Sequence, residues 1–212
     1  MKKARFAALL GAALVGILAA SAPAYAAVYQ LTVDNCTGGC NPGAPGTSMG
    51  TVTTTGSGTS TLTVTVALVS PLRFVNTGLQ ETIDFNLSGN PTLSGFTTTN
   101  SNFSLTSTTA GSNHFDGLGT FTYSLMLTTG QGAGGSQPSP ESFTITCSTV
   151  CTEITNSAGF FFGVDVYNPT RNTTGPIGTS GGTPQVPEPT SVLLLGTVLL
   201  AVGKVLKTRL VV

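Results

Sequence analysis

Four cysteines are the residues whose spacing points most directly to chemistry. They form two pairs with the same separation, Cys36 with Cys40 and Cys147 with Cys151. Three disulfide connectivities are open to four cysteines. We favour two local bonds over cross-pairing, because each intervening segment is short, loop-like and able to bring its sulfurs together. A local bond would pin the shape of a small loop and contribute little to overall stability.

Two other chemistries would use the same thiols. Paired cysteines also build four-thiolate zinc sites, but such ligands are usually spaced by two residues and an oxidising compartment competes for thiolates. A redox-active thiol pair is a further alternative. The sequence favours structural disulfides, and it predicts no metal site and no cofactor.

No residue is predicted to be catalytic. His114 is the only histidine, and His114 and Asp116 offer an imidazole and a carboxylate on one strand face. Because no Gly-x-Ser-x-Gly motif accompanies them, we expect a surface histidine before an Asp116–Gly117 turn. Glycoside hydrolysis needs two carboxylates facing one bond, and Glu81, Asp84, Asp116 and Asp165 are the acids to test for it. Asp116 and Asp165 are also candidate calcium ligands, but the spacing of an EF-hand is missing.

The two ends of the chain have the composition of targeting segments. Lys2, Lys3 and Arg5 precede an apolar stretch over 6–20, and Ala24-Tyr25-Ala26 follows. These are the three regions of a secretory signal peptide, so residues 1–26 are predicted to be removed by cleavage after Ala26, with Ala24 as the alternative position. Export would proceed through the Sec machinery.

The C-terminal segment, residues 187–212, begins with Pro187-Glu188-Pro189. An apolar run over 191–203 follows, and then Lys204, Lys207 and Arg209. As a helix this run is about 20 Å long, and it approaches the bilayer core of about 30 Å only if Val205 and Leu206 are included. Basic residues would hold this end on the cytoplasmic side of the membrane.

Taken together, Val186–Gly196 and the basic end resemble the PEP-CTERM sorting signal of Gram-negative bacteria. The resemblance implies that exosortase, a membrane protease-transpeptidase, recognises Pro187-Glu188-Pro189 and processes the tail. It implies a protein anchored transiently in the inner membrane and then delivered to the cell surface or extracellular matrix, often in bacteria that make exopolysaccharide. The basic end departs from the family pattern, because apolar residues separate what are often consecutive arginines.

Charge excludes one class of partner. Six of the eight basic residues lie in the two terminal segments, which leaves Arg73 and Arg171 against seven acids between residues 27 and 186. A domain with about five net negative charges and no basic patch has nothing to neutralise phosphates, so nucleic-acid binding is not expected.

The residues between the targeting segments follow the period of β-strands. Apolar residues alternate with polar ones over 61–68, 82–87 and 120–127, shorter versions occur at 29–33, 103–105 and 143–145, and an apolar run covers 160–166. We expect an all-β fold, a single jelly-roll-like β-sandwich over 27–174, followed by a flexible Gly/Thr/Pro linker over 175–186. A β-solenoid is the alternative, but no repeat occurs at constant spacing.

The abundant threonines suit the exposed faces of such strands, and O-linked glycosylation is the alternative explanation. We therefore expect a non-enzymatic surface or matrix protein with a structural or adhesive role, associated with exopolysaccharide. A secreted carbohydrate-active hydrolase, or a sugar-binding module that uses the acids of the β domain, is the alternative.

Overall fold

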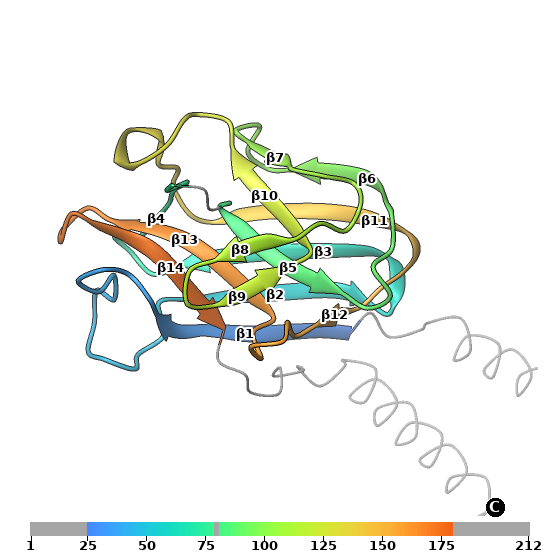
Figure 1. Cartoon of the computed structure of the whole chain (residues 1–212), viewed down its shortest axis with the longest axis horizontal. Coiled ribbons are helices and arrows are strands. Elements are labelled where there is room, and N and C mark those ends of the chain that lie inside the picture. Colours follow the sequence, from blue (N-terminus) through green and yellow to red (C-terminus); the bar gives the residue numbers. More distant parts are fainter. Residues whose placement is uncertain (1–24, 79–80, 180–212) are drawn as a thin grey trace, which may run out of the picture. The chain divides into compact units, whose positions relative to one another are not determined.

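The computed structural model describes residues 25–78 and 81–179, and these form an all-β domain, which confirms the predicted fold class (Figure 1). The strands are β1 (Tyr25–Asp34), β2 (Gly50–Ser57), β3 (Thr59–Leu68), β4 (Arg73–Phe74), β5 (Ile83–Leu87), β6 (Leu93–Thr98), β7 (Phe103–Leu105), β8 (Asn113–Phe115), β9 (Gly119–Phe121), β10 (Tyr123–Leu127), β11 (Glu141–Cys151), β12 (Glu153–Ile154), β13 (Phe162–Asn168) and β14 (Thr173–Thr179). In these ranges the one helical element is the 3-10 turn Ala133–Gly135.

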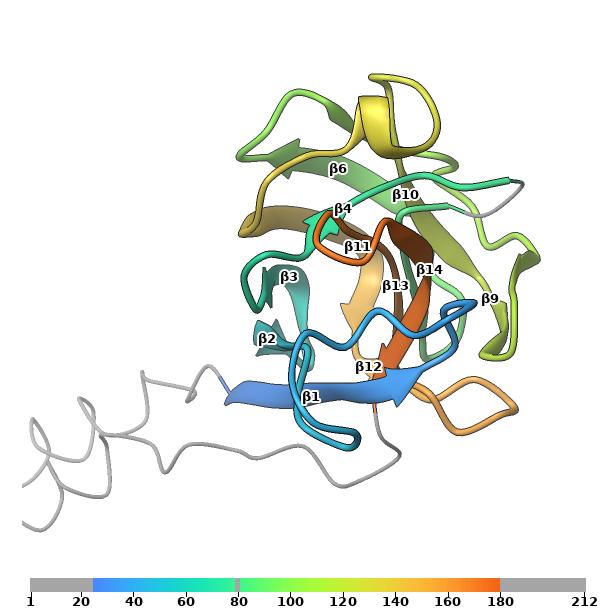
Figure 2. The ribbon, with the colours of Figure 1, turned by 90° about the vertical axis from the view of Figure 1, so that its left-hand side faces the viewer.

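Twelve of the strands belong to one antiparallel sheet. Ten lie along the path β6-β11-β3-β2-β1-β14-β13-β5-β10-β7, while β12 pairs with β5 and β4 with β13. The sheet curls around the core (Figure 2). Its two end strands, β6 and β7, are consecutive in the chain, and the Leu93 N–H donates to the Thr108 carbonyl at 2.7 Å beside them. The sheet is therefore nearly closed.

Strand β1 joins the two halves of this sheet. Residues from Tyr25 to Gln30 pair with β2, whereas Leu31 to Asp34 pair with β14, and a bulge lies between Leu31 and Val33. A bulge bends a strand and increases its local twist. Because of this bend, the first residues of β1 pair with one half of the sheet and its last residues pair with the other half.

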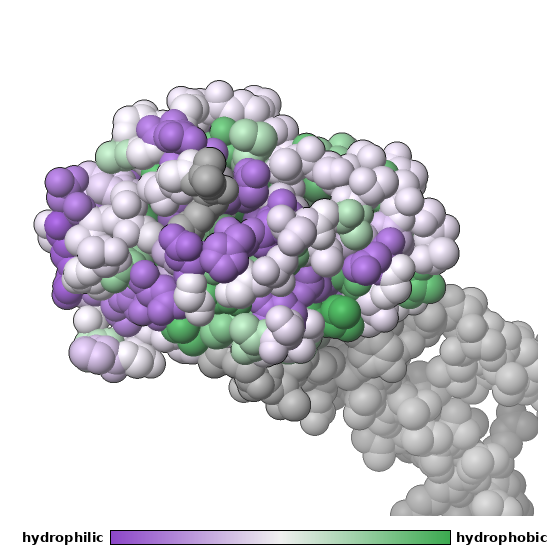
Figure 3. Space-filling model, viewed as in Figure 1, coloured by the Kyte–Doolittle hydropathy of each residue, from purple (hydrophilic) through white to green (hydrophobic). Residues whose placement is uncertain are grey.

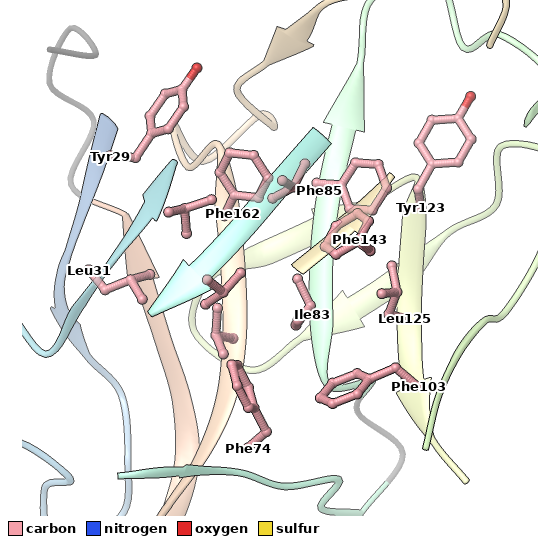
Figure 4. Close-up of a cluster of buried hydrophobic side chains, with 14 of the residues drawn as sticks. Tyr29, Leu31, Phe74, Ile83, Phe85, Phe103, Tyr123, Leu125, Phe143 and Phe162 are labelled. Atoms are coloured by element: carbon pink, nitrogen blue, oxygen red, sulfur yellow. The ribbon is translucent and has the colours of Figure 1, made fainter. Parts of the chain in front are cut away.

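Aromatic side chains fill the space between the two halves (Figure 4). The ring centroid of Phe85 on β5 lies 5.8 Å from that of Phe143 on β11 and 5.6 Å from that of Tyr123 on β10. Tyr29 on β1 lies 5.3 Å from Phe162 on β13. The Phe85–Phe143 and Tyr29–Phe162 contacts cross from one half of the sheet to the other, whereas Phe85 and Tyr123 lie on neighbouring strands of one half. The halves therefore pack as two facing layers.

A separate hairpin covers the outside of one layer. Strands β8 and β9 pair only with each other, and their Phe115, Leu118 and Phe121 form a second small core. At Gly163 on β13, a Cβ atom would lie 2.9 Å from the Phe115 ring and 3.2 Å from the Phe121 ring. Glycine at this position therefore lets the hairpin lie close against β13.

The alternating patterns located several strands correctly. Residues 61–68 lie in β3, 82–87 contain β5, and the run at 160–166 overlaps β13, which is buried on both faces. The pattern over 120–127 was interpreted as one strand, but it is divided between β9 and β10. Asn86 Oδ1 accepts from the Thr122 N–H at 2.7 Å and from its hydroxyl at 3.0 Å, which fixes the chain at the break.

The predicted domain boundaries need one correction and one addition. Residues 175–179, predicted as the start of the linker, belong to β14, where Ile177 pairs with Val164 of β13 and is buried. At the other end, β1 includes Ala26, which pairs with Thr55, so cleavage after Ala26 would remove the first two residues of this strand.

The remaining terminal predictions concern residues outside the described ranges. They are Ala24, the linker from residue 180, the sorting motif Pro187-Glu188-Pro189, the hydrophobic helix and the basic residues Lys204, Lys207 and Arg209. Among the residues that are described, none forms a helix with the length and apolar character needed to cross a bilayer.

Both disulfides are local, as the sequence favours. The Cα atoms of Cys36 and Cys40 lie 5.5 Å apart, and those of Cys147 and Cys151 lie 5.7 Å apart. No described cysteine is free, so the alternative four-thiolate zinc site does not form.

The position of Phe85 makes it the most sensitive point of the core. Replacing Phe85 by Ala removes a fully buried ring that touches both layers, and we expect the free energy of unfolding to fall by about 3–5 kcal/mol. Urea denaturation followed by circular dichroism measures this. Ile154→Ala, at a side chain that is 41% exposed, is the control and should change stability by less than about 0.5 kcal/mol. Equal effects of the two substitutions would contradict the assignment of the core.

Candidate functional site

The outward face of β5 carries a row of polar side chains that are buried. Ile83, Phe85 and Leu87 point into the main core, so Asp84 and Asn86 point to the other side of the sheet. Both of these polar side chains are nevertheless buried, because the β8–β9 hairpin covers this side. Polar groups buried in a protein normally find hydrogen-bond partners. Asn86 has its partner in Thr122, as described above.

Asp84 has no such partner. Its side chain is 0% exposed, and neither carboxyl oxygen accepts a hydrogen bond from any described residue. On one side it lies directly opposite Ser124 of β10, whose hydroxyl is also buried and unbonded. On the other side it lies opposite Gly163, under the rings of the hairpin.

A second aspartate lies close by on the same face. Asp165 comes two residues after Gly163 on β13, so its side chain points to the same side as that of Asp84. It is 0% exposed, and its Oδ2 accepts from the Thr77 N–H at 2.7 Å and the Thr77 hydroxyl at 2.5 Å. Its Oδ1 accepts no hydrogen bond. Asp84, Asp165 and Ser124 are called the buried acidic site below.

Other buried or partly buried carboxyl groups of the domain accept hydrogen bonds. Glu141 accepts from the hydroxyls of Thr98 and Thr99, and Glu153 accepts from the Ser57 hydroxyl. Asp34 accepts from three backbone N–H groups, those of Cys36, Cys40 and Asn41. Among the described residues, Asp84 is therefore the buried carboxyl for which the fold supplies no donor to either oxygen.

The electrostatic surroundings of the site are negative. Burial raises the pKa of Asp84 well above its usual range, and the charges of Glu81 and Asp165 raise it further. Burial likewise raises the pKa of Asp165 to about 7, against the hydrogen bonds of Thr77, and Asp116 adds to the rise. Of the four acids named from the sequence, Glu81 and Asp165 thus lie near enough to affect Asp84, and Asp116 lies near enough to affect Asp165.

The two arginines of the domain are not among the hydrogen-bond partners of the two buried aspartates. Arg73 Nε donates to the Ser136 hydroxyl and its Nη2 to the Ser136 carbonyl, both at 3.1 Å. Arg171 is exposed, near Gly39. His114 lies 3.6 Å from Asp116, and both of these side chains are 72% exposed. Their exposure agrees with the expected surface position of His114.

A second feature, on the other layer, is a regular array of hydroxyl groups. Strands β2, β3 and β11 turn Val52, Val64 and Ile145 inward and most of their threonines outward, whereas Thr54 of β2 is buried on the inner face. The array is called the hydroxyl face and comprises Thr53, Thr55, Thr63, Thr65, Thr97, Ser142 and Thr144. Its rows follow the strand register, as in Thr55↔Thr63↔Thr144↔Thr97 and Thr53↔Thr65↔Ser142.

Within each row, a hydrogen bond links strand β3 to strand β11. The hydroxyls of Thr63 and Thr144 lie 2.9 Å apart, and those of Thr65 and Ser142 also lie 2.9 Å apart. The backbone positions that carry these hydroxyls are spaced by about 4.8 Å across strands and by about 6.8 Å along them. None of the seven residues is charged, so the hydroxyl face is polar, neutral and repetitive.

The rest of the described surface carries fewer features that suggest a function. The face that carries β8 and β9 is mainly polar, with scattered hydrophobic residues (Figure 3). A pocket lined by Leu68, Leu72, Arg73 and Pro138 has no acid among its lining residues, and the guanidinium of Arg73 is already hydrogen-bonded to Ser136. We therefore take the buried acidic site and the hydroxyl face as the candidate functional features.

No protein-family model, no curated protein and no solved structure matches this chain.

Burial of the acids makes the stability of the domain depend on pH. A carboxyl whose pKa is raised on folding favours the folded state most at low pH, and that contribution is lost as pH rises through the folded pKa. Asp165, with a pKa of about 7, and Asp84 both act in this direction. Without added metal ions, we expect the melting temperature to fall between pH 5 and pH 8.

Calorimetry in the presence of a chelator measures this fall, and each kcal/mol corresponds to about 2–4 °C in a domain of this size. Asp165→Asn should remove much of the pH dependence. Asp116→Asn is the matched control, because Asp116 is exposed and is a lesser influence on Asp165. A wild-type melting temperature that rises from pH 5 to pH 8 would show that these carboxyls are not buried as described.

Proposed function

We propose that the chain is an exported, exosortase-sorted protein of the cell surface or extracellular matrix, with a structural or adhesive role on exopolysaccharide. Its parts would be a signal peptide, a jelly-roll-like sandwich domain, a spacer and a sorting helix. The helix would anchor the protein in the inner membrane until processing. The observation that carries the adhesive role is the hydroxyl face.

Hydroxyl groups are suited to weak contact with a polysaccharide. Each can donate one hydrogen bond and accept two, as each sugar hydroxyl can. A row such as Thr55, Thr63, Thr144 and Thr97 presents several of these groups at a regular spacing to one extended chain. Individually weak contacts of this kind strengthen one another when they act on the same polymer.

Two disulfides support export, since such bonds persist in oxidising compartments. Burial of Asp84 and Asp165 favours the structural role over the hydrolytic alternative. A glycosidic bond must touch both carboxyl groups of a hydrolase, and these two are 0% exposed.

The sorting part of the proposal is tested on the tail. In cells with exosortase, the intact mass of the mature protein should correspond to a chain processed near Pro187-Glu188-Pro189. Deleting exosortase, or replacing Pro187 and Pro189 by Ala, should leave the tail attached and the protein in the membrane fraction. Pro184→Ala, just upstream of the motif, is the control and should be processed normally. An unprocessed tail in both strains would contradict the proposal.

The adhesive part is tested on the hydroxyl face. Thr→Val keeps the β-branched shape and removes the hydroxyl, so Thr55, Thr63 and Thr144 can be changed together with little effect on folding. We expect binding to immobilised exopolysaccharide from the producing strain to weaken about tenfold or more. Surface plasmon resonance measures the affinity.

The matched control changes three exposed threonines elsewhere, Thr120, Thr155 and Thr170, to Val. This variant should bind like the wild type. Equal weakening in both triple variants would assign binding to general surface polarity, and binding that is unchanged in both would remove the hydroxyl face from the proposal.

A further inference from the structure

The buried acidic site combines negative charge with missing donors. Asp84 has two unbonded carboxyl oxygens, Asp165 has one, and the unbonded hydroxyl of Ser124 lies directly opposite Asp84. All three side chains are essentially inaccessible to solvent. Leaving an ionised carboxylate in such a place without a partner is very costly, so buried charges are usually paired or bind metal ions.

The positive side chains of the domain lie elsewhere and do not neutralise the carboxyls of this site. Between residues 27 and 186 it contains two arginines. Arg73 is held by Ser136, and Arg171 is exposed near Gly39. The one histidine, His114, lies beside Asp116 at the surface. Among the described residues, no positive side chain therefore compensates the site, and Glu81 and Asp116 add further negative charge around it.

We propose that Asp84, Asp165 and Ser124 bind a calcium ion beneath the β8–β9 hairpin. The ion would take the place of the missing donors, with both oxygens of Asp84, Oδ1 of Asp165 and the Ser124 hydroxyl as protein ligands. This site differs from the one that the sequence suggested around Asp116, because Asp116 is exposed at the turn of the hairpin.

The ligands select calcium among the common cations. All are oxygen atoms, which suits hard cations and disfavours zinc, which prefers nitrogen and sulfur. Calcium accepts bidentate carboxylates and irregular geometry. Magnesium demands a near-ideal octahedron and usually keeps several waters, which a solvent-inaccessible position does not favour.

The covering hairpin provides a way in. Strands β8 and β9 share no strand pairing with the main sheet and rest on it through Phe115, Leu118 and Phe121. Opening of this small contact would expose Asp84 without breaking the main core. Asp116 and the partly buried Glu81 would then attract a cation towards the site.

The test uses the purified full-length protein, first stripped with a chelator and then titrated with calcium chloride at pH 7.5. Isothermal titration calorimetry should show one calcium ion per chain, with a dissociation constant of about 10⁻⁴–10⁻³ M, the range of extracellular modules. Saturating calcium should raise the melting temperature by about 5 °C or more. Magnesium at the same concentration should raise it less.

Asp84→Asn and Asp165→Asn should each lose the calorimetric signal and the calcium-dependent rise in melting temperature. Asp84→Asn should be more stable than the wild type in chelator, since it removes an unpaired buried charge. Ser124→Ala keeps both carboxyls and should weaken binding by several-fold, so the proposal remains testable if an Asn variant does not fold. Glu141→Gln, at an acid outside the site, should bind calcium like the wild type.

Three results would overturn the proposal. One is no heat and no change in melting temperature with calcium up to 10 mM, roughly ten times the weakest expected dissociation constant, which would mean that Asp84 and Asp165 share a proton instead. Another is calcium binding that survives in Asp84→Asn. A third is a stronger response to magnesium than to calcium. None depends on exosortase sorting or on polysaccharide binding.

Discussion

The sharing of β1 between two layers is the constraint on which the domain depends. Its first half pairs with β2 and its second half with β14, across the bulge between Leu31 and Val33. Without that division the layers would be separate sheets with open edges, which are prone to pair with other chains. The loop that follows is held in turn, because the carboxylate of Asp34 accepts the N–H groups of Cys36 and Cys40, and their disulfide closes it. The disulfide therefore fixes the loop at the end of the strand that joins the layers.

Curling around one core leaves the two layers with different outer faces. On β2, β3, β11 and β6 the outward residues are hydroxyl groups that remain at the surface and bond to one another. On β13 and β5 the β8–β9 hairpin covers the outward residues, and close contact at Gly163 is what permits it. The same strand alternation therefore yields a neutral contact surface on one side and buried carboxyls on the other. We propose adhesion for the first and cation binding for the second, and substitutions can remove each without the other.

Strand periodicity predicted much of the fold and less of the site. Thr61 to Leu68 alternate cleanly, because β3 is buried on one face only, and the pattern located this strand. The apolar residues Phe121 and Tyr123 continue an equally regular alternation with polar residues, but they belong to two strands, and the Thr122 N–H between them donates to Asn86 instead of pairing within a strand. The glycine, proline and threonine residues around Ile177 predict a linker, yet Ile177 pairs with Val164 of β13 and is part of the sheet. Composition describes local preference, and pairing with distant strands overrides it.

By itself, the sequence determined the all-β class, the terminal targeting patterns as predictions, the local spacing that favours Cys36–Cys40 and Cys147–Cys151, and the outward direction of Asp84 within β5. These follow from short-range rules of period, composition and reach. Only the tertiary structure decided that the outward-pointing side chain of Asp84 is buried and that Asp165 lies on the same face of the sheet. It also decided that neither arginine lies beside these two carboxyls. An acid inside the apolar run of β13 was a signal of burial, but its neighbours could not be named. The reason is physical: the hairpin that buries the two carboxyls and the strands that carry them come from three separate stretches of chain.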